Sequence, residues 1–101
     1  MDYLKLPTDQ NPQKRWDNIM NSADNQRLVA IRYRDKDNAL SVRKVEPYEI
    51  KNGKLFAFDP EKGSIRAFST NNIEAALQTD ELYEPRYPIK INSSMMSDGS
   101  L

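Results

Sequence analysis

The sequence predicts a mainly β fold: a small antiparallel β-barrel with one short N-terminal helix. Three observations lead to this prediction. Short runs in which apolar and polar residues alternate follow one another between residues 28 and 68. Turn-forming residues separate these runs, most clearly Asn52-Gly53 and the segment 59–63. A single segment with helical spacing of its apolar residues precedes them.

The helix is expected over residues 13–23. Asn11 and Pro12 precede it, and both are preferred at the first positions of a helix. Its apolar residues recur at the spacing of one helical face, which must lie against a core; they are Trp16, Ile19, Met20 and Ala23.

The first strand is expected over residues 28–34, where the side chains alternate with a period of two. Residues 35–38 are polar and form a reversal. Leu40 starts a second strand, and Pro47 ends its regular pairing or confines it to a sheet edge, because proline has no N–H to donate. Residues 48–50 then resume an extended chain.

Two hairpins follow. Asn52-Gly53 predicts a tight turn into a strand over 55–58, and Pro60 with Gly63 predicts a second turn. In the strand after this turn, alternation places Arg66 on the same face as Phe68. Five short strands within fifty residues favour closure into a barrel, which removes exposed edges.

The segment 73–78 fits two structures. Its residues favour a helix, with cap residues ahead of it, and its alternation equally fits a closing strand. Residues 89–91 are expected to add a last short edge strand, through which two copies can associate.

At 101 residues the chain has the length of one ordinary domain. We expect a loosely ordered arm over residues 1–12, the domain itself over 13–91 and a disordered tail over 92–101. The tail has no period and few large apolar residues to offset the entropy of ordering it.

The chain contains no cysteine and no histidine. These absences remove Ser-His and Cys-His nucleophile activation and the usual zinc ligand sets, so we predict no enzyme, no metal site and no cofactor. No apolar run approaches the roughly 18–20 residues that span a bilayer. Because a chain without cysteine suits a reducing compartment, we expect a cytoplasmic protein that does not enter the membrane.

The net charge is zero, but the charges are unevenly distributed. Residues 27–66 hold ten basic and six acidic side chains, whereas residues 67–101 hold two basic and five acidic ones. A modest positive excess on a strand-rich module attracts partners that carry phosphate, although it is far below the density of a dedicated duplex binder.

The order of the motifs resembles that of the WYL domain over roughly residues 16–87. The motifs are Val29-Ala30-Ile31-Arg32-Tyr33, Arg43-Lys44-Val45-Glu46-Pro47-Tyr48-Glu49-Ile50, Lys54-Leu55-Phe56-Ala57-Phe58-Asp59, Arg66-Ala67-Phe68 with Ile73, and Tyr83-Glu84-Pro85-Arg86. The resemblance implies an Sm-like or SH3-like barrel that binds a nucleotide or nucleic acid through basic side chains, often in bacterial transcription regulators or phage-defence proteins.

In this resemblance, Arg43 and Pro47 match the family's Arg-x-x-x-Pro element, and Arg66 with Phe68 matches its Arg-x-Phe element. The Trp-Tyr-Leu tripeptide that names the family is absent, and residues 69–72 lack the family's further basic residues. The chain therefore resembles a divergent, stand-alone member of the kind expected from a phage.

Arg43 and Arg66 are the principal candidate ligand-binding residues. Two guanidinium groups on neighbouring strands can hold one phosphate, a geometry that lysine reproduces poorly. Tyr48 can stack on a base beside them, and Arg32 and Arg34 can extend the basic strip. Alternatively, Arg43 and Arg66 form ordinary cross-strand ion pairs, the candidate partners being Glu46, Glu49 and Glu74.

These observations predict a non-catalytic binding or regulatory module that recognises nucleic acid or a nucleotide through a basic strand face. The alternative is a protein-interaction module, in which a phage-type accessory or structural protein docks on a host or virion protein through its barrel edge and tail. A homo-oligomer formed through edge strands is compatible with both functions.

Overall fold

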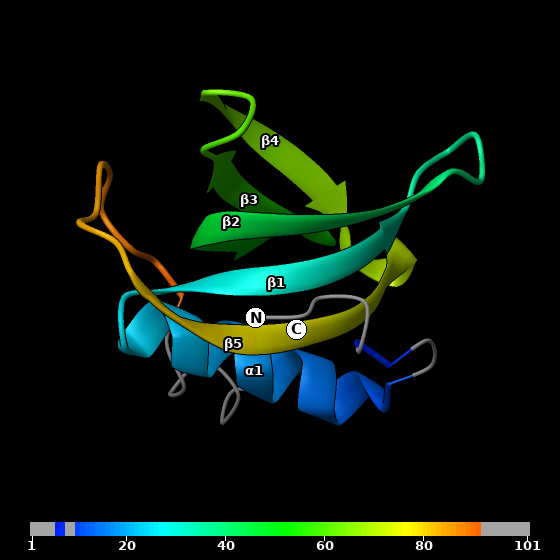
Figure 1. Cartoon of the computed structure of the whole chain (residues 1–101), viewed down its shortest axis with the longest axis horizontal. Coiled ribbons are helices and arrows are strands. Elements are labelled where there is room, and N and C mark those ends of the chain that lie inside the picture. Colours follow the sequence, from blue (N-terminus) through cyan, green and yellow to red (C-terminus); the bar gives the residue numbers. More distant parts are fainter. Residues whose placement is uncertain (1–5, 8–9, 92–101) are drawn as a thin grey trace.

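The computed structural model describes residues 6–7 and 10–91. It consists of one helix packed against a strongly bent, five-stranded antiparallel sheet with the order β4-β3-β2-β1-β5 (Figure 1). The elements are α1 (Pro12–Asp24), β1 (Arg27–Arg34), β2 (Leu40–Lys51), β3 (Lys54–Asp59), β4 (Ser64–Ser69), the 3₁₀ turn η2 (Thr70–Asn72) and β5 (Ile73–Leu82).

The bend of the sheet is produced by β2, the longest strand. Its first half, residues 40–45, pairs with β1, and its second half, residues 46–51, pairs with β3. The register shifts between Pro47 and Glu49, directly after the point where β2 changes partners. A bulge of this kind bends a strand, so the two halves of the sheet turn toward each other.

Helix α1 begins as its sequence predicts. The side chain of Asn11 accepts a hydrogen bond from the backbone N–H of Gln13 at 2.8 Å, and Pro12 occupies the first turn. The apolar face of α1 buries Ile19, Met20 and Ala23. Trp16 is half-buried and packs against the same core, as expected of an anchor.

The main core fills the space between the concave side of the sheet and α1. It draws side chains from every strand, with Ile91 from the segment after β5: Val29, Ile31, Val45, Leu55, Ala57, Phe68, Ile73, Ala76 and Ile91. A smaller cluster on the convex side places Leu6 against Ala30 and Ala75. Both faces of β1 are therefore covered along its central part.

The expected barrel is not formed, because the sheet stays open between β4 and β5. The outer edge of β5 is occupied at residues 73–76 by other donors and acceptors. Arg15 donates to the carbonyl of Ile73, Asn18 donates to that of Ala76, and Gln10 bonds to Glu74 and Ala76. These groups use the positions that a closing β4 would need.

Two further expectations are corrected by the described residues. Pro47 does not end the second strand, because β2 runs through it to Lys51. Residues 89–91 form no strand, and Ile91 is buried, so this segment is not an exposed edge. The ambiguous segment 73–78 is the first part of strand β5.

The described residues include no helix that is long and apolar enough to cross a membrane. Most of the arm expected over residues 1–12, and the whole tail over 92–101, lie outside the described residues.

Candidate functional site

Arg43 and Arg66 meet at one carboxylate. The Nη1 atom of Arg43 lies 3.3 Å from Oδ2 of Asp59, and the Nη1 atom of Arg66 lies 4.0 Å from the same oxygen. Arg43 comes from β2, Asp59 from the end of β3 and Arg66 from β4. The three side chains form the Arg43–Asp59–Arg66 cluster, with two positive charges and one negative charge.

Asp59 is the buried centre of this cluster, with its side chain only 1% exposed. Its other oxygen, Oδ1, accepts hydrogen bonds from the backbone N–H groups of Glu61 and Lys62 at 3.0 and 3.4 Å. The carboxylate thus joins the β3–β4 turn to both arginines. Their side chains are more accessible, at 21% for Arg43 and 38% for Arg66.

The cluster lies at one end of the concave side of the sheet, not on its outer face. Arg43 is paired with Ile31, and Arg66 is paired with Ala57, both of which face the core. Directly opposed residues in an antiparallel pair point to the same face. The concave surface therefore changes from an apolar core near α1 to charged groups at the β3–β4 turn.

Phe68 supports the exposed arginine of the cluster. The guanidinium carbon of Arg66 lies 5.6 Å from the centre of the Phe68 ring, within the range of a cation–π contact. Tyr33 also packs against this ring in an edge-on arrangement, with centroids 5.0 Å apart. Phe68 therefore contacts both Tyr33 and the guanidinium group of Arg66.

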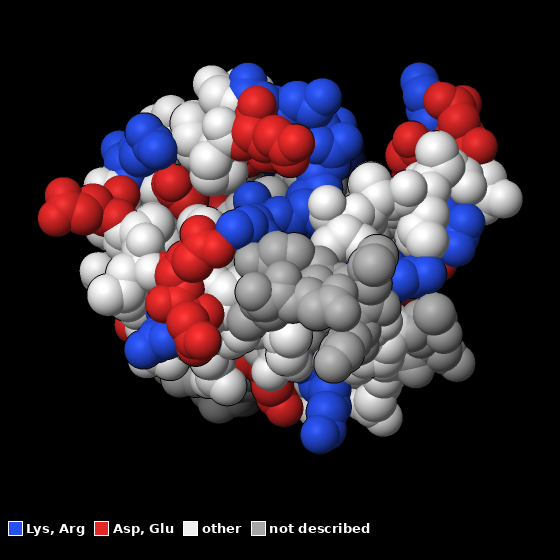
Figure 2. Space-filling model, in the orientation of Figure 1, with Lys and Arg blue, Asp and Glu red and all other residues white. Residues whose placement is uncertain are grey.

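Figure 2 shows Lys and Arg side chains gathered over β2, β3 and β4, with Asp and Glu side chains among them. This face is therefore of mixed charge. The expected ion-pair partners of Arg43 and Arg66 were Glu46, Glu49 and Glu74, but Asp59 holds both arginines.

Tyr48 does not lie on the surface beside Arg43 and Arg66, where the sequence predicts it. Its ring is buried, and its hydroxyl donates to Oε1 of Glu46 at 2.7 Å while accepting from the backbone N–H of Arg86 at 2.8 Å. Tyr83 and Tyr87 pack edge-on against the ring. The segment after β5 covers this tyrosine, so its ring faces offer no platform for a base.

Burial raises the pKa of the Tyr48 hydroxyl to about 12, with the hydrogen bond from Arg86 opposing the shift and Glu46 reinforcing it. Burial also raises the pKa of Tyr83. The pKa of Tyr48 is higher in the folded state than its ordinary value of 10, so the protonated hydroxyl stabilises the folded state. This contribution to the free energy of unfolding is complete below pH 10 and is lost as the pH rises toward about 12.

We therefore expect the free energy of unfolding to fall steeply between pH 10 and about 12, together with the appearance of tyrosinate absorbance. Denaturant titrations across this window measure the effect. Tyr48→Phe is expected to flatten the pH dependence in part, because Tyr83 remains. An equally steep fall in Tyr48→Phe would show that another group is responsible.

Arg32 and Arg34 form a separate pair on the other face of the sheet. Their Nε atoms lie 3.3 and 2.7 Å from the two carboxylate oxygens of Glu74 on β5. The hydrogen bond from Arg34 is the largest cause that lowers the pKa of Glu74, and Arg32 lowers it further. These arginines do not extend the surface that carries Arg43 and Arg66.

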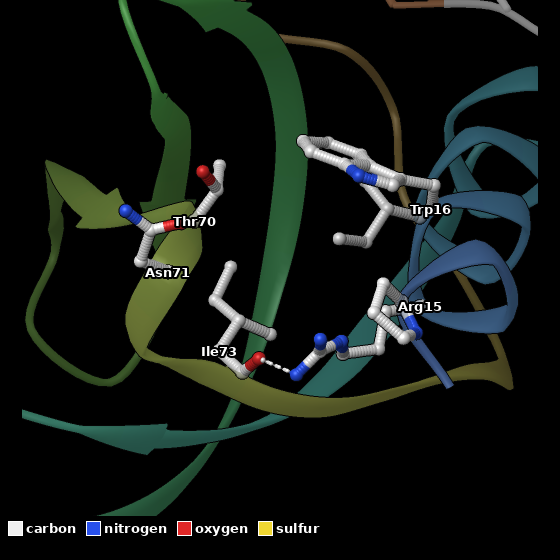
Figure 3. A pocket seen from close by; sticks show the side chains of 7 residues that line it. Arg15, Trp16, Thr70, Asn71 and Ile73 are labelled. Carbon is white, nitrogen blue, oxygen red and sulfur yellow. Dashed lines mark hydrogen bonds between the residues drawn. The ribbon is translucent and has the colours of Figure 1, made fainter. Parts of the chain in front are cut away.

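A cavity of about 220 Å³ lies between α1 and η2 (Figure 3). Arg15 and Trp16 project from the helix toward the opposite wall, which is formed by Thr70, Asn71 and Ile73. Arg15 is already held by the carbonyl of Ile73 at 2.6 Å. Among the described residues, no three or more acidic side chains lie close enough together to bind a metal ion.

Comparison with known proteins gives a family-model match and a set of similar solved structures. The family model of the WYL domain matches residues 15–77, which is more than half of the chain. Among solved structures, the chain is similar to proteasome accessory factor B/C (PafBC) of Arthrobacter aurescens, with a TM-score of 0.65 and 20% identity over 95% of this chain. The match spans 16% of the PafBC chain. No curated protein matches the sequence.

Proposed function

The chain belongs to the WYL domain family, and we propose that it is a non-catalytic regulatory module that binds a nucleotide or nucleic acid through Arg43 and Arg66. The observation that carries this proposal is the position of both guanidinium groups at one oxygen of Asp59. An anion that approaches this point meets two forked donors at once.

The electrostatics of the Arg43–Asp59–Arg66 cluster favour a single phosphate group. Asp59 neutralises only one of the two guanidinium charges, so the cluster keeps one positive charge. The contact of Arg66 with Asp59 is long, at 4.0 Å, and this side chain is the most exposed of the three. Arg66 can therefore donate some of its N–H groups to a phosphate, while Arg43 stays paired with the carboxylate of Asp59.

Substitution of Arg66 tests the proposal. We expect Arg66→Gln to weaken the binding of a single-stranded oligonucleotide roughly tenfold, because one charge-assisted contact is lost. The slope of log affinity against log salt should fall by about 0.7, the value for one phosphate contact on a single strand. Fluorescence anisotropy at several salt concentrations, with DNA, RNA and mononucleotides as ligands, measures both quantities.

Arg27→Gln is the matched control. The side chain of Arg27 is 38% exposed, as is that of Arg66, and its partner Asp80 lies on the surface. The control removes the same charge at the same degree of exposure, so it should leave binding nearly unchanged. Equal affinities for the two variants, or no binding by the unsubstituted protein, would contradict the proposal. Glutamine is preferred to glutamate, because a second carboxylate beside buried Asp59 would destabilise the fold.

A further inference from the structure

The two edges of the sheet differ in their accessibility. The outer edge of β5 is occupied at residues 73–76 by Gln10, Arg15 and Asn18, whereas no strand or loop among the described residues pairs with the outer edge of β4 (Figure 1). Ile65 on β4 is a large apolar residue that is 42% exposed. An unpaired, partly apolar edge strand is a template for another extended chain.

The register identifies which backbone groups of β4 point outward. The N–H of Thr70 bonds to the carbonyl of Gly53, the residue directly before β3, while the N–H of Ser69 bonds to the hydroxyl of Tyr33. Backbone groups of alternate residues point to opposite sides of a strand in an antiparallel ladder. The N–H and C=O groups of Ala67 and Ile65 therefore point away from β3.

An apolar groove of about 340 Å³ lies on the convex side of β2, β3 and β4 and includes Ile65 of the edge strand in its lining. Its lining also includes Phe56 of β3 and, from the segment after β5, Tyr87 and Pro88. Phe56 is paired with Ala67, whose side chain is only a methyl group. A long apolar side chain on a chain added to β4 can thus lie across Ala67 and reach Phe56.

On the concave side of the sheet, a side chain of the added strand would lie opposite Arg66. Residues of β4 alternate, so Arg66 points to the concave side while Ile65 and Ala67 point to the convex side. An acidic residue placed opposite Arg66 would form a cross-strand ion pair. We propose that β4 binds an extended partner peptide with an apolar–acidic–apolar pattern, by addition of a strand to the sheet.

A second copy of this chain fits the edge less well. An antiparallel register of two β4 strands centred on Ala67 would use the N–H of Ser69, which already bonds to the hydroxyl of Tyr33. In the register centred on Arg66, each Ile65 faces an Ala67 and the two Arg66 side chains face each other. Like charges directly opposite are destabilising. The occupant that the charges favour is therefore an acidic segment of a different protein.

The probe for this surface is the blocked peptide Ser-Thr-Leu-Asp-Val-Thr-Ser, in which Leu, Asp and Val are designed to face Ala67, Arg66 and Ile65. With isotope-labelled full-length protein, we expect saturable shifts of the amide NMR signals of these β4 residues. Replacing the Asp of the peptide by Lys should weaken binding roughly tenfold, because the ion pair becomes a repulsion.

Ala67→Pro removes one outward N–H and leaves the β3–β4 pairing intact, since that N–H does not face β3. We expect it to weaken the peptide roughly threefold to tenfold with little change in the thermal midpoint. Ile65→Thr should also weaken binding, whereas Leu77→Thr on β5, at a similar exposure of 39%, should not.

Shifts centred on another surface, equal binding of the Asp and Lys peptides, or no saturable shift would overturn the proposal. So would sedimentation of the protein alone as a dimer whose β4 amides are protected, because a second copy would then be the occupant.

Discussion

Asp59→Asn is expected to lower stability and strengthen ligand binding at the same time. The substitution removes the negative charge that holds Arg43 and Arg66, while the amide oxygen still accepts hydrogen bonds from the β3–β4 turn. We expect a loss of about 1–3 kcal/mol in the free energy of unfolding. Binding of a single-stranded oligonucleotide should become roughly threefold to tenfold tighter, because the competing carboxylate is gone.

Denaturant unfolding and anisotropy titration measure these opposite effects on one protein. Asp59→Ala is the comparison, since it also removes the acceptor of the turn amides and should cost about 2–4 kcal/mol. If Asp59→Asn weakened ligand binding in a protein shown to be folded, the carboxylate would be orienting the arginines for the ligand and not competing with it.

Phe68→Ala is expected to have the largest effect on stability. The ring is 1% exposed, lies in the main core and contacts both Tyr33 and Arg66. Removing a buried phenyl group leaves a cavity and costs about 3–5 kcal/mol. For a domain of this size, such a loss is a large part of the total free energy of unfolding. The variant should therefore unfold at a much lower temperature than the unsubstituted protein.

Phe68→Leu separates packing from the aromatic contact. Leucine retains most of the apolar volume, so we expect a smaller loss, about 1–2 kcal/mol, together with a more mobile Arg66. Oligonucleotide binding should then weaken more than the stability change explains. Unchanged binding by Phe68→Leu would show that the ring does not position the guanidinium group.

The local structure could be predicted because its signals are local. Asn11 and Pro12 determine the start of α1, Asn52-Gly53 forms a tight turn, and Asp59 accepts the hydrogen bonds of the next turn. Each of these features depends on side chains within a few residues of one another. Gly53 and Gly63 both have a positive φ, as their turns require.

The open sheet could not be predicted in this way, because it depends on contacts between distant segments. Closure of β4 on β5 competes with hydrogen bonds from Arg15 and Asn18, which lie about sixty positions earlier in the chain. The continuity of β2 through Pro47 likewise depends on a bulge where the strand exchanges partners. Neither contact has a signature in the local sequence.

The candidate site was predicted in part. Arg43 and Arg66 do meet, but the prediction missed Asp59 between them. Alternation alone places Asp59 on the same face as Ala57 and Leu55, so an acidic residue at the end of the core face was a usable signal. Alternation also separates Arg43 from Tyr48, since an odd spacing puts two strand residues on opposite faces.

The hydrogen bonds along β5 have a consequence for growth of the sheet into larger polymers. A fibre that grows by adding one subunit after another needs two unpaired strand edges on every subunit. Here side chains of the helix and Gln10 occupy the outer edge of β5 at residues 73–76, whereas no backbone segment among the described residues pairs with the outer edge of β4. Addition of a further strand is therefore hindered at the start of β5 and open at β4, which limits the growth of β aggregates although the sheet is not closed into a barrel.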